Sequence, residues 1–153
     1  MVDELNVAVD NSEDKAKMVI VVRKDLKMPK GKAISQGAHA AVAAIFQAIF
    51  NTRLDNPDFK LCDEGFEINK PAILDDATKD WLSGEFTKIC VAVNSEAELD
   101  EIYNKASEAG LNCSLIVDNG HTVFNGEKTK TCLAIGPSYS SIIDPITKNL
   151  PLY

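Results

Sequence analysis

Four short apolar runs rich in β-branched residues constrain the fold more than any other feature of the sequence. They are MVIVV at 18–22, KICVAV at 88–93, NCSLIV at 112–117 and TCLAI at 131–135. Each has the length and composition of a buried strand. Segments of helical composition separate the first run from the second and the second from the third. Because strand–helix–strand alternation gives parallel neighbours through right-handed crossovers, the sequence predicts an α/β fold.

Two longer helices are predicted between these strands. The Ala-rich segment 32–50 follows a polar loop in which Pro29 and Gly31 act as breakers. Its apolar residues surround the helix axis, which predicts burial on most sides. A second helix over 95–109 opens with the capping-box spacing of Ser95 and Glu98 and ends before a glycine. Shorter helices are expected at 75–82, capped by the first residue of that range, and at 138–144, before a proline.

The third and fourth strands are joined by a short turn-rich stretch, which favours an antiparallel pair. Gly136-Pro137 is expected to stop the fourth strand. The predicted architecture is therefore a single α/β domain with a four-stranded mixed β-sheet covered by helices on both faces.

Charge is distributed unevenly along the 153 residues, whose formal net charge is −7. This acidic balance disfavours a uniformly basic nucleic-acid binder. Residues 15–32, however, hold seven bases and one acid, a local patch that can hold a polyanion at contact distance. Residues 1–14 hold five acids and no base. We predict a disordered acidic tail at 1–16.

No feature of the sequence predicts a membrane or secretory protein. No uninterrupted apolar run reaches ~18 residues, and the first 17 residues lack the basic and apolar regions of a secretory signal. The four cysteines form no CxxC pair and are expected to be reduced thiols, with Cys90, Cys113 and Cys132 buried in apolar runs. The only histidines are His39 and His121, so no metal site is expected. These features predict a cytoplasmic protein with no membrane partner.

One candidate site lies at the start of the long helix. Lys32, Gln36 and His39 are spaced i, i+4 and i+7 and share a helix face. A lysine in a first turn opposes the helix dipole, so this one either gathers positive charge for an anion or is an ordinary surface lysine. His39 by itself is better explained as a core or partly buried histidine with a local hydrogen bond.

A second candidate site follows the third strand, at Asp118-Asn119-Gly120-His121-Thr122. An acid at a strand's end in an open α/β sheet lies where ligands usually bind, but an Asx turn explains it too. Asp118 and Lys32 can form a charge pair in a cleft, which would hold the carboxylate ionised. Thr131, entering the fourth strand, is either a strand former or a hydroxyl that bonds a ligand.

Taken in order, four stretches resemble one family. MVIVVRKDLKMPKGKAISQGAHAAV, LIVDNGHT, TCLAIGP and the terminal LPLY are similar to the archaeal and eukaryotic-type peptidyl-tRNA hydrolases. The resemblance runs from Met18 to Tyr153. It implies a hydrolase-like domain at 17–153, with an insertion at about 51–86.

The activity that the resemblance implies is cleavage of the ester joining a peptide to the 3′ end of tRNA. The family works without a metal or organic cofactor and is often dimeric, so the implied partners are peptidyl-tRNA and a second copy of the chain. The implied catalytic residues are Lys32, Asp118, Thr122 and Thr131. The expected substrate-binding residues are Lys24, Lys27, Lys30, Gln36, His39 and His121.

The chain departs from the family pattern at three places. Pro29 replaces the usual glycine before Lys-Gly-Lys, and His121 replaces an arginine that is fully charged at neutral pH. The 51–86 connection is longer and more acidic than usual, as a lid or a partner surface would be. Two other functions stay open: a module that binds a tRNA end or a protein without cleavage, and a regulatory domain that holds a small anionic metabolite.

Overall fold

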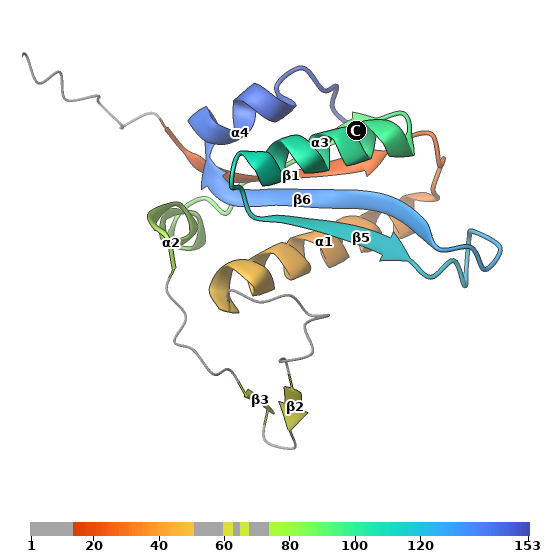
Figure 1. Ribbon diagram of the computed structural model, residues 1–153, viewed down its shortest axis with the longest axis horizontal. Helices are drawn as coiled ribbons and strands as arrows, with labels where there is room; N and C mark the ends of the chain where they lie inside the picture. The colour runs from red at the N-terminus through yellow and green to blue at the C-terminus, as the bar shows by residue number, and fades with distance from the viewer. Residues whose placement is uncertain (1–13, 51–59, 63–64, 68–73) are drawn as a thin grey trace, which may run out of the picture.

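The computed structural model describes residues 14–50, 60–62, 65–67 and 74–153 (Figure 1). Its elements in chain order are β1 (Ala16–Arg23), α1 (Lys30–Phe50), β2 (Lys60–Cys62), β3 (Gly65–Glu67), α2 (Asp76–Ser83), β4 (Lys88–Val93), α3 (Glu96–Glu108), β5 (Cys113–Asp118), β6 (Thr129–Tyr139) and α4 (Ser140–Thr147).

The main sheet has four strands in the order β4-β1-β6-β5. β1 is parallel to β4 and antiparallel to β6, and β5 is antiparallel to β6. The mixed sheet and the antiparallel β5–β6 pair are therefore confirmed. β2 and β3 form a separate antiparallel pair.

Helices cover both faces of the sheet, as predicted (Figure 1). Alternation along β1 divides the core, because successive side chains of a strand point to opposite faces. Val19 and Val21 pack in the cluster that includes residues of α3 and α4, whereas Ile20 packs in the cluster that includes residues of α1 and α2. Each face thus has its own apolar core, and one strand contributes to both.

The helix α1 begins at Lys30, two residues before the predicted start. The amide of Ala33 donates to the carbonyl of Pro29 at 3.0 Å, so Pro29 precedes the first turn and Gly31 lies inside it. Burial on most sides was a wrong prediction: Gln36, Ala40 and Ala44 are the buried residues of α1. The reason is that α1 lies in an outer layer, where only one side faces the sheet.

By length and composition alone, α1 would be able to cross a membrane, and it is the one described helix of which this is true. The core helix of a soluble protein passes the same test. The segment is not an uninterrupted apolar run, because polar residues such as Gln36 and His39 interrupt it. Ala40 and Ala44 of this helix pack in the same cluster as Ile20 of the sheet.

Gly136-Pro137 does not stop the last strand. The peptide bond is cis, and β6 continues to Tyr139, which pairs with Ala16 of β1. The register of β1 against β6 shifts between Lys17 and Val19, so a bulge accommodates the proline, which has no N–H to give to the ladder. As a result α4 begins only at Ser140.

The last helix also differs from the prediction, because Pro145 lies within α4 rather than after it. The amide of Lys148 still donates to the carbonyl of Asp144 at 3.0 Å. The proline thus removes one helical hydrogen bond without ending the helix.

The first strand begins inside the segment expected to be an acidic tail. Ala16 belongs to β1, and the carboxylate of Asp14 accepts a hydrogen bond from the amide of Ser141 at 2.9 Å. The predicted tail therefore extends too far, because residues 14–16 belong to the folded part of the chain. The rest of the expected tail, 1–13, lies outside the described residues.

Part of the expected 51–86 insertion belongs to the main core. Trp81 of α2 is 2% exposed and packs in the same cluster as Ile20. Its Nε1 donates to the carbonyl of Thr87 at 2.8 Å. The ranges 51–59, 63–64 and 68–73 of that insertion lie outside the described residues.

Two of the three cysteines expected in the core are there. Cys113 and Cys132 are buried, but Cys90 is exposed. Because β4 is an outer strand of the sheet, only its last three residues, Val91–Val93, are buried. All three of these cysteines are free thiols.

Candidate active site

The two candidate sites of the sequence meet in space. Lys32 lies in the first turn of α1, and Asp118 is the last residue of β5. Nζ of Lys32 lies 2.6 Å from Oδ1 of Asp118, and the two side chains are only 14% and 13% exposed. The predicted charge pair is therefore present, sheltered from bulk water at the carboxyl end of a strand.

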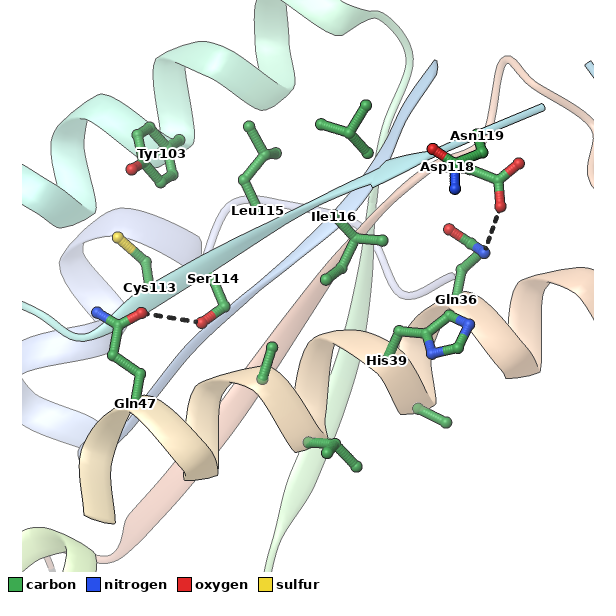
Figure 2. Close-up of a pocket in the computed structure, with 14 residues that line it drawn as sticks. Gln36, His39, Gln47, Tyr103, Cys113, Ser114, Leu115, Ile116, Asp118 and Asn119 are labelled. Carbon is green, nitrogen blue, oxygen red and sulfur yellow. Dashed lines mark hydrogen bonds between the residues drawn. The ribbon is translucent and has the colours of Figure 1, made fainter. Parts of the chain in front are cut away.

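A chain of hydrogen bonds connects this pair to the core. Nε2 of Gln36, one turn along α1 from Lys32, donates to Oδ1 of Asp118 at 3.1 Å (Figure 2). The hydroxyl of Thr131 donates to Oε1 of the same glutamine at 2.5 Å. Gln36 and Thr131 are 2% and 0% exposed. Thr131 therefore acts on the site through Gln36 and does not face the surface itself.

The Asx turn considered for Asp118 is present together with the charge pair. Oδ2 of Asp118 accepts a hydrogen bond from the amide of Gly120 at 2.9 Å, which is an Asx turn, while Oδ1 faces the charge pair. Gly120 has a φ of +79°, and a Cβ there would lie 2.3 Å from the carbonyl oxygen of Glu127. The turn thus needs glycine, and it holds the carboxylate in one orientation.

These donors lower the pKa of the Asp118 carboxyl below its usual value. The hydrogen bond from Lys32 is the largest cause, and the bonds from Gly120 and Gln36 act in the same direction against partial burial. Asp118 is therefore a carboxylate at neutral pH and a weak base.

The ammonium group of Lys32 has a second partner in Oγ1 of Thr122, at 3.2 Å. An ammonium carries three donors, so one remains after Asp118 and Thr122. The ring centroid of Phe124 lies 5.7 Å from Nζ of Lys32 and adds a cation–π contact. The sequence analysis missed Phe124, because an aromatic residue in a turn-rich stretch has no motif to mark it.

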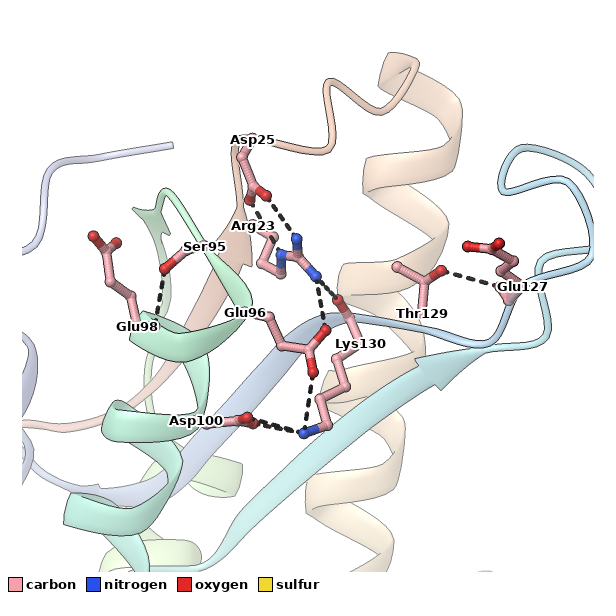
Figure 3. A network of polar contacts seen from close by, with 9 residues as sticks. All are labelled: Arg23, Asp25, Ser95, Glu96, Glu98, Asp100, Glu127, Thr129 and Lys130. Carbon is pink, nitrogen blue, oxygen red and sulfur yellow. Dashed lines mark hydrogen bonds and ion pairs between the residues drawn. The ribbon is translucent and has the colours of Figure 1, made fainter.

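Ion pairing divides the basic stretch 15–32 into two groups. Four of its seven bases pair with carboxylates: Lys15 with Glu85, Lys17 with Asp144, Arg23 with Asp25 and Glu96, and Lys32 with Asp118. Figure 3 shows the Arg23 network, in which Lys130 also contacts Glu96 and Asp100. The other three, Lys24, Lys27 and Lys30, are exposed and form no ion pair with the described residues.

A groove of about 710 Å³ runs from the charge pair along α1 and β5 (Figure 2). Gln36 and Asp118 lie at one end and Gln47 at the other. His39 lines this groove and is exposed, which rules out the core-histidine explanation. His121 and Thr122 are exposed in the loop after β5, so His121 lies at the surface beside a partner of Lys32.

The described residues contain no group of three or more His, Cys, Asp or Glu side chains that would hold a metal ion. The arrangement that is present offers an ammonium donor, an oriented carboxylate and a hydroxyl beside an exposed cationic surface. Such a set can polarise a carbonyl and orient a water molecule next to a bound polyanion.

The fold and the site define an α/β protein with a sheltered lysine–aspartate pair at the carboxyl end of β5. The family model for peptidyl-tRNA hydrolase PTH2 matches residues 16–153. The chain belongs to this family, as the resemblance implied.

Curated relatives agree with that assignment. A peptidyl-tRNA hydrolase of Methanocaldococcus jannaschii is 41% identical over 136 residues, which are 89% of this chain and 98% of the relative. That of Aeropyrum pernix is 36% identical over 90% of this chain and 95% of its own length. A probable peptidyl-tRNA hydrolase 2 of Drosophila melanogaster is 38% identical over 91% of this chain and 62% of its own length.

Proposed function

We propose that this chain hydrolyses the ester bond between a peptide and the 3′ end of tRNA at the site built by Lys32 and Asp118. The observation that carries the proposal is the sheltered 2.6 Å contact between Nζ of Lys32 and Oδ1 of Asp118. Asp118 lines the groove along β5, and three exposed lysines lie in the segment that leads into and begins α1. Family membership supports the reaction, and the geometry supports the residues.

The reaction begins with water bonded to the carboxylate of Asp118 and attacking the ester carbonyl. Because its pKa is lowered, Asp118 serves mainly to orient the water and to stabilise the positive charge that develops on it. The remaining donor of Lys32 stabilises the negative charge on the carbonyl oxygen. The bond between the acyl carbon and the ribose 3′ oxygen then breaks, and the 3′ oxygen takes up the proton that the attacking water gives up. The products are a peptide with a free carboxyl group and a tRNA with a free 3′ hydroxyl.

The other predicted residues have supporting parts. Thr122 accepts from Lys32, so its own O–H is available to a substrate oxygen. Gln36 and Thr131 position Asp118 and are positioning residues, because both are buried. Lys24, Lys27 and Lys30, with His121, contact tRNA phosphates, while His39 contacts the substrate from the groove.

We also propose a cytoplasmic location and a homodimeric state, without a membrane partner. The location follows from a substrate produced by translation. Sedimentation at micromolar concentration distinguishes the dimer from the monomer, and fractionation of cells tests the location.

The proposed function is tested by release of labelled N-acetyl-aminoacyl groups from tRNA. We expect release by the wild type and a loss of about 10²- to 10³-fold in Lys32→Ala and Asp118→Asn. Asp144→Asn is a matched control, since Asp144 pairs with Lys17 outside the site. Equal release by all the variants would remove Lys32 and Asp118 from the site. No release by the folded wild type, with measurable tRNA affinity, would favour the non-catalytic binding module.

A further inference from the structure

We propose that the peptide part of the substrate binds along the open edge of β5 as an added, parallel strand. This inference rests on the proposed function and names the subsite that would hold the peptide released from tRNA. It is carried by the groove, by the contrast between the two edges of the sheet, and by the direction of β5.

The groove follows β5 along its whole length. Its lining includes every residue from Cys113 to Asn119, together with side chains of α1 and with Tyr103 of α3 (Figure 2). One end holds Gln36 and Asp118, which belong to the hydrogen-bonded chain of the site. The groove is therefore continuous with the position where the ester carbonyl must lie.

The two edges of the main sheet differ. The edge of β4 pairs with the segment 151–153. The amide of Ala92 donates to the carbonyl of Pro151 at 2.8 Å, and the amide of Tyr153 donates to the carbonyl of Cys90 at 3.1 Å. β5 is the opposite outer strand, and within the described part of the chain no backbone pairs with its outer side. An open edge presents N–H and C=O groups that an extended peptide can use.

The direction of β5 determines the direction of the peptide. β5 ends at Asp118, and the peptide's C-terminal residue carries the ester. A peptide with that ester at Asp118 and its N-terminus toward Cys113 runs parallel to β5. At about 3.3 Å per residue, the strand spans about five extended peptide residues.

Backbone pairing suits this substrate. Peptides attached to tRNA share a main chain but no sequence, and strand addition takes its affinity from main-chain hydrogen bonds. The rim of the groove adds apolar contact without a deep side-chain pocket: Val42 of α1 and Val117 of β5 are 61% and 48% exposed. The site would thus accept varied peptides and prefer longer ones.

The test compares two substrates on the same tRNA, N-acetyl-aminoacyl and N-acetyl-hexapeptidyl. We expect the wild type to have a KM about tenfold lower for the hexapeptidyl substrate. Methylation of alternate peptide nitrogens should remove this preference in one of the two registers, because it removes the N–H donors that face β5. Exchange of side chains at the same positions should change it less than twofold.

Val42→Trp fills the rim of the groove and should reduce the KM ratio between the two substrates to near one. Ile34→Trp is the matched control, because Ile34 is 73% exposed on the same helix but does not line the groove. An effect on tRNA binding cancels in the ratio, since both substrates carry the same tRNA.

The outcomes separate this inference from the function on which it rests. If the wild type cleaves neither substrate, the proposed function fails and the inference with it. If it cleaves both with equal KM, or if methylation has no effect in the first register and none in the second, hydrolysis stands and the peptide subsite is wrong. If Val42→Trp instead dissociates a dimer and leaves the ratio unchanged, a second copy occupies the edge and the inference is overturned.

Discussion

Thr131 determines which end of the Gln36 amide faces Asp118. Its hydroxyl donates to Oε1 of Gln36 at 2.5 Å, and this leaves Nε2 to donate to Oδ1 of Asp118 at 3.1 Å. Thr131, on the inner strand β6, thereby determines that an N–H group of Gln36, and not its oxygen, faces Asp118 on the outer strand β5. The Asp118 carboxylate and the core strand β6 are connected through one side chain.

Thr131→Val should lower kcat about tenfold with little change in KM. The substitution keeps the shape but leaves Oε1 of Gln36 buried without its donor, which costs about 1–3 kcal/mol of stability and frees the amide to turn. Steady-state kinetics and urea unfolding measure the two effects. Thr147→Val removes another buried hydroxyl, on α4, and should affect stability only. An unchanged kcat in folded Thr131→Val would contradict the positioning role.

Lys32→Met should raise the pKa of Asp118. The hydrogen bond from Lys32 is the main reason that this pKa is lowered, so its removal moves the value toward or above the ordinary range. Carboxyl carbon chemical shifts of Asp118, followed from pH 2 to 7, measure the change. The same titration of Lys30→Met serves as the control, because Lys30 is exposed in the same helical turn.

The stability lost in Lys32→Met should depend on pH. Because the pKa of Asp118 is lowered in the folded state, its carboxylate stabilises that state at pH values above the unfolded pKa of about 3.9. This contribution is lost as the pH falls through the pKa of the folded state. The difference in unfolding free energy between wild type and Lys32→Met should therefore be larger at pH 6 than at pH 3. A difference that is constant across this window would mean that the pair does not stabilise the fold electrostatically.

Replacing Lys24, Lys27 and Lys30 together with alanine should weaken tRNA binding and its salt dependence. For every phosphate that the variant no longer neutralises, the slope of log affinity against log salt should become shallower by about 0.7–0.9. Filter binding between 50 and 300 mM salt measures the slope. Lys148→Ala, at an exposed position after α4, is the control. A slope that the triple variant leaves unchanged would exclude these lysines from the tRNA interface.

His121→Arg should tighten tRNA binding by about two- to fivefold at pH 8, the range of one exposed ion pair. The exposed loop position beside Thr122 gives an arginine room to reach a phosphate. Affinity at pH 6 and at pH 8 measures the gain and its pH dependence. Asn125→Arg, at an exposed position in the same loop, controls for added charge alone.

Trp81→Ala should destabilise the fold by about 3–5 kcal/mol, because it empties a buried aromatic position. The side chain is 2% exposed, stacks on Phe86 with ring centroids 4.0 Å apart, and donates to a backbone carbonyl. Denaturant unfolding gives the value. Leu82→Ala, the next residue and 39% exposed, should cost less than about 1 kcal/mol. Similar destabilisation by both would show that α2 is not part of the core.

Local patterns predicted most of the elements. All four predicted strands are present, and the cap of α3 forms as its spacing predicted, with Oγ of Ser95 accepting from the amide of Glu98 at 3.1 Å. Three of the wrong boundaries lie next to Pro29, Pro137 and Pro145, and a fourth lies at the start of β1. A proline lacks one donor, and whether this ends an element depends on the partner across the sheet or along the helix.

The two halves of the site were also found from the sequence, because Lys32 and Asp118 each stand at the end of an element. Their contact was predicted as a charge pair, and the structure confirms it at 2.6 Å. The polarity of Gln36 and the burial of Thr131 were not predicted, since these depend on how α1 lies across β5 and β6. The three exposed lysines were separated from their four paired neighbours mainly by the positions of carboxylates far away in the chain, although Arg23 also pairs with the nearby Asp25.

The sequence by itself determined the strands, the helices and the residues available for chemistry, because periodicity and capping act over a few neighbouring positions. The tertiary structure decided which charges are paired, which threonine is buried, and that the edge of β5 stays open among the described residues while the edge of β4 is covered. Those properties depend on distances between groups that are remote from one another in the sequence. They arise only when the sheet order brings the ends of α1 and β5 together.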